Sequence, residues 1–205
     1  WVSLGLLFSV AFMSLSLIPT MPYISSVILP LIFCGYCFMQ RSRTDWSRFW
    51  QARSSLALVI LWMLCSALFS GNAFQGYWLP ILNPFDLVSL AMLVTFYWML
   101  NLQLKAGMDK GIIAVLAVLS LLWLSSYVLL RALHVYFATP YNQLALWQSA
   151  LVQLSFTLLW VSLAFISMSW ASHKQLRPMW ILGGSILVIV TLKLVLFDLS
   201  HIGTL

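Results

Sequence analysis

The chain alternates long apolar stretches with short polar gaps. A helix needs about 20 apolar residues to span the hydrocarbon core of a bilayer. Seven stretches approach or reach that length, and they cover residues 1–18, 22–39, 54–70, 84–101, 111–133, 147–171 and 179–200. Each should be a helix, because an open strand in lipid leaves backbone polar groups unpaired. The pattern predicts an all-α, polytopic transmembrane helix bundle of about seven helices, forming a single domain over residues 1–205.

The basic residues give this bundle an orientation. Eight of the ten Lys and Arg residues lie in alternate gaps: four in 40–53, two in 102–110 and two in 172–178, against none in 19–21, 71–83 and 134–146. Cytoplasmic loops of membrane proteins carry an excess of Lys and Arg. The three gaps that carry the basic residues, 40–53, 102–110 and 172–178, are therefore predicted to be cytoplasmic. The N-terminus is then cytoplasmic and the C-terminus extracytoplasmic.

The composition indicates a membrane protein and argues against nucleic acid as its partner. The chain is 63% hydrophobic and 7% charged, whereas soluble domains carry about 25% charged residues. The net charge of +6 is spread over short loops, so it does not indicate nucleic-acid binding. The chain starts at Trp1 and ends just after the last apolar run. We therefore expect a fragment of a longer protein, with membrane lipid and the rest of that protein or other membrane subunits as its partners.

The cysteines do not favour a redox or metal site. Cys34 and Cys37 form a CxxC pair near the end of a run that we place toward the cytoplasm, and Cys65 stands alone. Thiols in such apolar surroundings are usually buried as small apolar residues. The histidines lie at another level of the membrane, so we expect no metal and no cofactor. Glutamate is absent, which excludes any mechanism that needs one.

Ionisable side chains within the apolar runs are the strongest candidates for a site. Such residues are costly in lipid and usually face the protein interior. The predicted topology places all of them in the outer half of the membrane, where two glutamines begin the sixth run at the same level. We therefore expect an outer-facing polar pocket, with these ligand-binding candidates: Asp86, Arg131, His134, Gln148, Gln153, Lys193, Asp198 and His201.

Several of these residues also have a purely structural interpretation. Asp86 follows Asn83-Pro84, which is typical of a helix start with a capping Asn and an acid in the first turn. Arg131 sits where it would reach lipid phosphates. Lys193 and Asp198 are five residues apart, so in an α-helix they diverge by about 140° and should not share a face.

The sixth run carries a stripe of small and polar residues at helical spacing. Its members are Ser149, Gln153, Thr157, Trp160, Ala164, Ser167 and Ala171. Small residues at this spacing let helices approach closely, and the polar ones hydrogen-bond across the contact. We interpret the stripe as a helix-packing face in preference to a substrate path.

Three segments resemble a known family. They are TLKLVLFDLSHIGTL at 191–205, NPFDL at 83–87 and RALHVYFATP at 131–140. They are similar to those of a bacterial family of large predicted multi-helix membrane proteins of unknown function. The resemblance covers about the last 125 residues and is weak before Leu79. It implies a bacterial inner-membrane protein and a fragment of a longer chain, and it supplies no reaction.

Three functions fit these observations. The leading hypothesis is a component of envelope biogenesis in the bacterial inner membrane, which uses the outer-facing pocket for binding, transport or complex formation. The alternative is a membrane-embedded transferase acting on lipid-linked or periplasmic substrates, with His134 as the catalytic base and Arg131 and Lys193 holding an anion. A third possibility is a purely structural subunit. The inner halves of the runs carry few ionisable residues, which argues against ion-coupled transport.

Overall fold

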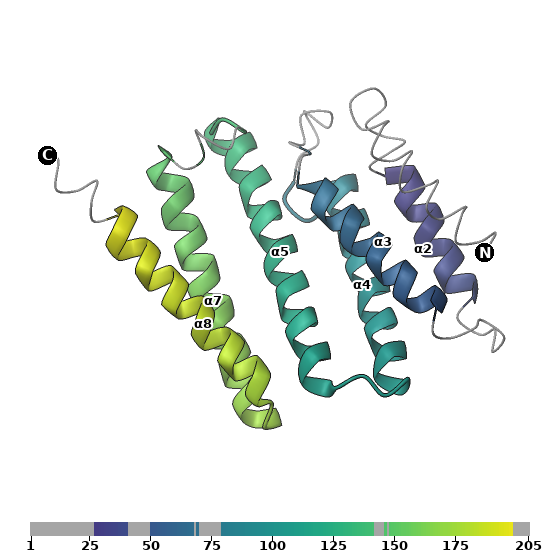
Figure 1. Cartoon of the computed structure of the whole chain (residues 1–205). Helices are drawn as coiled ribbons and strands as arrows, with labels where there is room; N and C mark the ends of the chain where they lie inside the picture. Colours follow the sequence, from purple (N-terminus) through teal and green to yellow (C-terminus); the bar gives the residue numbers. More distant parts are fainter. Residues whose placement is uncertain are drawn as a thin grey trace, which may run out of the picture. The chain divides into compact units, whose positions relative to one another are not determined.

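A computed structural model describes residues 27–40, 50–67, 69, 79–141, 146 and 148–198. Its helices are α2 (Leu29–Gln40), α3 (Trp50–Ser66), α4 (Pro84–Lys105), α5 (Lys110–Phe137), α7 (Ala150–Lys174) and α8 (Arg177–Lys193), and the π-helical segment η3 (Leu194–Asp198) continues α8 (Figure 1). The described residues contain no strand, so the all-α prediction is confirmed for them. The predicted helix at 1–18 and residues 41–49 of the basic gap at 40–53 lie outside the described residues.

Within the described residues, four helices are long and apolar enough to cross a membrane. They are Pro84–Lys105, Lys110–Phe137, Ala150–Lys174 and Arg177–Leu196, with 22, 28, 25 and 20 residues. At about 1.5 Å per residue the shortest spans about 30 Å, which matches the hydrocarbon core. The helices confirm the predicted runs but shift their ends: α4 and α5 each continue four residues past the predicted boundary.

The chain divides into two compact units, Trp1–Met108 and Asp109–Leu205. In the first unit α2 and α3 both pack against α4. The rings of Phe69 and Phe85 stack with centroids 4.5 Å apart, and Trp62 lies 6.0 Å from Phe85. This aromatic cluster anchors the start of α4 to the end of α3.

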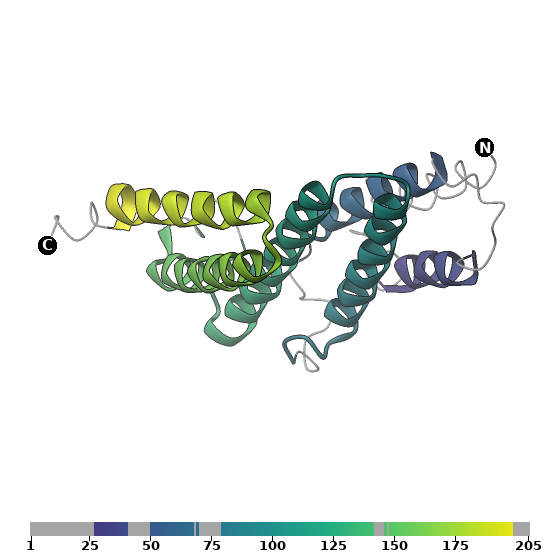
Figure 2. The same cartoon turned by 90° about the horizontal axis from the view of Figure 1, so that it is seen from below.

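The second unit consists of α5, α7, α8 and η3. Helices α7 and α8 lie side by side along most of their length (Figures 1 and 2). Gly183 makes this possible, because an added Cβ there would lie 2.4 Å from Met168 Cγ and 3.1 Å from the Ala164 carbonyl oxygen. Ala164, Ser167 and Ala171 are buried. The packing interpretation of the stripe is therefore confirmed for residues 164–171, in the half of α7 that is nearer to the α7–α8 turn.

The helix ends of the second unit follow local sequence signals. The Asp109 carboxylate caps α5 by accepting hydrogen bonds from the backbone N–H groups of Gly111 and Ile112, at 2.7 and 3.1 Å. Ser149 caps α7 by accepting from the Val152 N–H. The chain leaves α7 through Gln175, whose left-handed backbone (φ 56°) reverses its direction into α8.

The end of α8 changes the helical geometry. Residues 194–198 are π-helical, and a π-helix closes i→i+5 hydrogen bonds instead of i→i+4 bonds. The divergence of about 140° between positions 193 and 198 assumed a continuous α-helix, so that angle does not carry across this segment. Lys193 itself bonds to α7, and the Asp198 side chain lies outside the described part of the chain, so the relative facing of these two side chains stays a prediction.

Candidate functional site in the second unit

A cavity of about 570 Å³ lies among α5, α7, α8 and η3. Its wall is mostly apolar, with Leu130, Val152, Phe156, Ile189 and Leu196 among the lining residues. These positions belong to the helix ends that lie away from the α7–α8 turn at 175–176. The cavity therefore lies in the half of the unit opposite the basic residues that flank this turn.

Lys193 is a charged residue of the cavity wall. Its Nζ donates to the Gln153 carbonyl oxygen and to Thr157 Oγ1, both at 2.9 Å. Thr157 Oγ1 itself donates to the same Gln153 carbonyl at 2.9 Å. The Gln153 side chain turns the other way, and its Nε2 donates to the Leu146 carbonyl at 3.2 Å. These bonds tie α8 to α7 and hold an ammonium group beside an otherwise apolar space.

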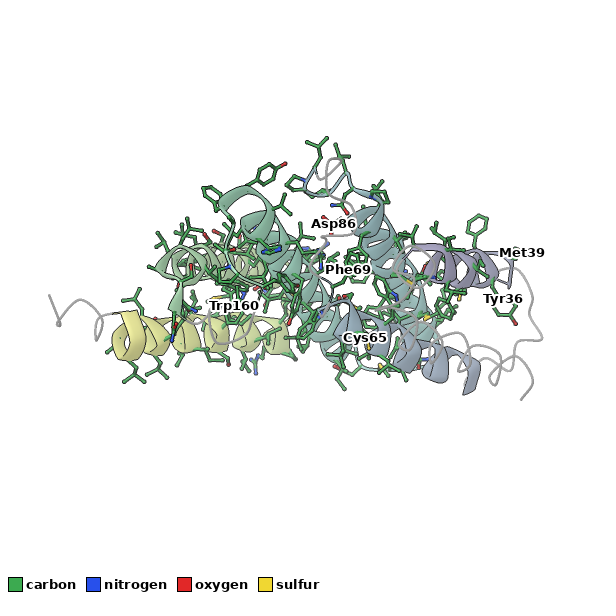
Figure 3. All side chains as sticks on the ribbon, turned by 90° about the horizontal axis from the view of Figure 1, so that it is seen from above. Tyr36, Met39, Cys65, Phe69, Asp86 and Trp160 are labelled. Carbon is green, nitrogen blue, oxygen red and sulfur yellow. The ribbon has the colours of Figure 1, made fainter. Side chains whose placement is uncertain are left out.

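Trp160 joins the cavity to α5. Its indole N–H donates to Ser126 Oγ at 2.9 Å, and the Ser126 hydroxyl donates to the Leu122 carbonyl at 2.7 Å. The rings of Trp160 and Phe156 meet edge to face, with centroids 5.9 Å apart. Figure 3 labels Trp160 among the side chains of α7. The indole thus forms part of the wall while its N–H is held by a neighbouring helix.

Arg131 and His134 lie on α5 but not in the cavity wall among the described residues. Arg131 is fully buried (0% exposed), one helical turn beyond Tyr127, which does line the cavity. His134 Nδ1 donates to the Thr139 carbonyl oxygen just past the end of α5, and its ring meets Tyr141 edge-on with centroids 5.5 Å apart. His134 therefore braces the segment that follows α5.

Asp86 belongs to the first unit and lies in the first turn of α4, where it supports the cap residue Asn83. Asn83 Oδ1 accepts from the Asp86 N–H at 2.8 Å, while the Asp86 carboxylate accepts from Asn83 Nδ2 at 2.6 Å and from the Ile81 N–H at 3.2 Å. Both side chains are buried, and Asp86 is labelled in Figure 3. This reciprocal pair is the helix start that the Asn-Pro-Phe-Asp sequence indicates.

Among the remaining candidates in the described part of the chain, Gln153 meets Lys193 through its backbone carbonyl. Gln148 is exposed and does not line the cavity within the described residues. The Asp198 side chain and all of His201 lie outside the described part of the chain. Sequence analysis did not propose Tyr127, Thr157 or Trp160 as cavity residues. Thr157 and Trp160 were visible in the stripe on the sixth run, but only as packing residues.

The cysteines take part in side-chain packing of the first unit. Cys34 Sγ lies 3.4 Å from Met92 Sδ, and Thr95 Oγ1 donates to Cys34 Sγ at 3.3 Å. Cys37 is buried, and all three cysteines are free thiols. Within the described part of the chain, no three His, Cys, Asp or Glu side chains gather as a metal site would require.

Comparison with known proteins agrees with this architecture. The model of one family, described as predicted membrane protein (DUF2339), matches residues 1–205. The match reaches the first part of the chain, where the motifs showed little resemblance. None of the curated proteins and none of the solved structures matches the chain. With four helices able to span a bilayer in its described part and a family match over its whole length, the chain belongs to the DUF2339 family of predicted membrane proteins.

Proposed function

We propose that this protein is a membrane-embedded binding component, which holds a ligand with an apolar chain in the cavity of its second unit. One observation carries the proposal: the wall of an apolar cavity holds Lys193 by hydrogen bonds to a carbonyl and a hydroxyl of the neighbouring helix. Specific ligand sites have this composition, in which an apolar lining is combined with a few placed polar groups.

The position of the cavity across the membrane supports a role at the outer face of a bacterial inner membrane. Lys174 and Arg177 flank the α7–α8 turn, and the positive-inside rule puts that turn in the cytoplasm. Lys193 lies sixteen residues after Arg177, or about 24 Å along a helix axis. In a hydrocarbon core of about 30 Å, its backbone is then about 6 Å below the outer boundary. Such a site suits a component of envelope biogenesis.

A purely structural subunit is a weaker interpretation. Such a subunit predicts helices that fill the space between them. Here a groove of about 570 Å³, whose wall includes the exposed side chains of Ile189 and Leu196, stays open beside the close α7–α8 contact. A binding role gives that space a purpose.

The transferase alternative is also less well supported. It requires His134 as a base within reach of the substrate, yet His134 does not line the cavity among the described residues. Binding requires only the cavity and Lys193. We further propose that exposed apolar helix faces contact membrane lipid and the rest of a longer protein or other membrane subunits.

Filling the cavity tests the proposal. Ile189 lines the cavity and is 55% exposed, whereas its neighbour Val188 is 59% exposed and does not line it. Lipids retained by the protein after purification in mild detergent would be measured by native mass spectrometry. We expect Ile189→Trp to lose a lipid that the wild type and Val188→Trp retain. Equal retention by all three proteins would contradict the proposal.

A further inference from the structure

We propose that the ends of α5, α7 and α8 beside the α7–α8 turn form a binding surface for the headgroup of an anionic phospholipid. Three exposed basic residues make up this basic surface, one from each helix: Lys110, Lys174 and Arg177. It lies at the end of the second unit away from the cavity. A lipid bound there is therefore separate from any ligand of the cavity.

A close contact between α5 and α8 brings two of these charges together. Gly111 in the first turn of α5 lies against Pro178 in the first turn of α8, because an added Cβ at Gly111 would lie 2.5 Å from Pro178 Cγ. Each of these two residues directly follows a basic residue, Lys110 or Arg177, and consecutive Cα atoms are about 3.8 Å apart. Lys110 and Arg177 therefore begin neighbouring helices at the same end of the unit (Figure 1).

The α7–α8 turn adds the third basic residue. Helix α7 ends at Lys174 and α8 begins at Arg177, so two residues separate them. Gln175 has a left-handed backbone (φ 56°), and the Leu176 N–H donates to the Ala171 carbonyl oxygen at 3.0 Å. This is the Schellman arrangement, which satisfies the last carbonyl groups of a helix. The turn thus holds Lys174 and Arg177 close to each other on a defined backbone.

The basic surface keeps a net positive charge within the second unit. The sequence of this unit contains two side-chain carboxylates, Asp109 and Asp198. Asp198 follows Arg177 by 21 residues, which is about 30 Å along a helix axis. Asp109 lies beside Lys110 and caps α5. Three basic side chains therefore stand against one nearby carboxylate of the same unit, and an anion is favoured there.

Exposed indole rings beside the charges favour a lipid over a dissolved anion. Trp180 is 51% exposed and lies three residues after Arg177, while Trp170 is 58% exposed and lies four residues before Lys174. Residues three or four apart share a helix face, so each charge has an indole about 5 Å farther along its own face. Tryptophan is enriched at the membrane interface. A bound phospholipid would place its phosphate on the charges and its glycerol and first methylene groups against the rings.

A phosphodiester also matches the chemistry of the basic side chains. Arginine binds phosphate oxygens in a bidentate manner, whereas lysine acts as a point charge. Removing one Lys or Arg near an anionic lipid surface weakens binding about fivefold. In a zwitterionic phospholipid the positive choline group offsets the charge of the same phosphate. We therefore expect the surface to prefer lipids with a net negative charge.

The test measures lipid affinity of the whole chain in a neutral detergent by thermophoresis. The lipids are tetraoleoyl cardiolipin, dioleoyl phosphatidylglycerol and zwitterionic dioleoyl phosphatidylcholine, and inorganic phosphate is added as a competitor. We expect at least one anionic lipid to bind about tenfold more tightly than phosphatidylcholine, and millimolar phosphate to leave it bound. Equal affinities for the three lipids would overturn the proposal. Displacement of the anionic lipid by millimolar phosphate would also overturn it, because the surface would then be a site for free phosphate.

Charge-removing variants assign the preference to the basic surface. Lys174→Gln and Arg177→Gln should each weaken binding of the anionic lipid about fivefold, and the double variant about 25-fold. Both residues are exposed, so the helical circular dichroism should stay unchanged, as should the affinity for phosphatidylcholine. Arg177→Lys keeps the charge and is the matched control, which should retain the preference.

Asp109→Asn tests the same surface with the opposite sign. Asparagine caps a helix as well as aspartate does, so α5 keeps its cap while the surface loses its negative charge. The affinity for the anionic lipid should rise about fivefold. If the wild type, the double Gln variant and Asp109→Asn bound the anionic lipid equally, the lipid would bind elsewhere on the protein and the proposal would be refuted.

Discussion

Replacing Gly183 by Ala should separate helices α7 and α8. A Cβ at this position would lie 2.4 Å from Met168 Cγ, 2.9 Å from Ser167 Oγ and 3.1 Å from the Ala164 carbonyl oxygen. The Met side chain can turn away, but the Ala164 carbonyl belongs to the backbone of α7. The helices must therefore move apart by a few tenths of an ångström along the closest part of their contact.

The next residue supplies a matched control. Gly184 lies in the same helix, and a Cβ there would meet no atom within 4 Å. Both substitutions gain the same helix propensity, about 1 kcal/mol for Gly to Ala in water. Their difference therefore isolates the steric clash. Overpacking a filled contact costs about 1–3 kcal/mol, so we expect Gly183→Ala to be about 2 kcal/mol less stable than Gly184→Ala.

The free energy of unfolding in detergent micelles, measured by denaturant titration of helical circular dichroism, would check this difference. Gly184→Ala should equal or slightly exceed the wild type in stability. If the two variants proved equally stable, the close approach of α7 and α8 at Gly183 would be refuted. The stripe residues Ala164, Ser167 and Ala171 on α7 would then no longer count as a packing face.

Three further predictions concern other parts of the chain. Asp86→Ala should lower the unfolding free energy by about 1–3 kcal/mol, because the buried Asn83 amide loses one of its two acceptors and the Ile81 N–H loses its carboxylate partner; unchanged stability in the same titration would contradict the role of Asp86 in holding the start of α4. In intact cells, an impermeant thiol reagent should label Asn72→Cys but not Ser47→Cys in a background without other cysteines, and the reverse pattern would invert the proposed topology. Replacing Cys34 and Cys37 together by Ala should leave lipid retention unchanged, and a clear loss at normal protein levels would show that these thiols matter.

Much of the fold was predictable because lipid imposes simple rules on a sequence. Apolar runs of membrane-spanning length must be helical, and Pro84 and Pro178 sit at helix starts as their missing N–H groups require. The ends of α4 and α5 were placed too early. Helical hydrogen bonding continues through the polar residues that follow an apolar run, so hydropathy alone underestimates helix length.

The site was only partly predictable from the sequence. The position of a polar residue within an apolar run indicates its depth in the membrane, but it does not indicate which other helix that residue contacts. Lys193 and Gln153 were candidates from their depth alone, and in the structure Lys193 bonds to the backbone carbonyl of Gln153 while the Gln153 side chain bonds to Leu146. The same argument grouped His134 with them, yet its Nδ1 bonds to the local backbone at Thr139. Which helix faces which depends on packing between segments far apart in the chain. The π-helical turn after Lys193 breaks the 3.6-residue period on which any such count relies.

The short turn at Gln175 and Leu176 has a consequence for the order of assembly. Helices α7 and α8 follow one another after two residues, so little chain entropy is lost when they close on each other. The contact at Gly183 joins segments near in sequence, whereas the bond from Trp160 to Ser126 spans 34 residues. Local contacts form faster than distant ones. The α7–α8 hairpin should therefore form first during insertion. Helix α5 then packs against the completed hairpin, so the cavity between the three helices forms last.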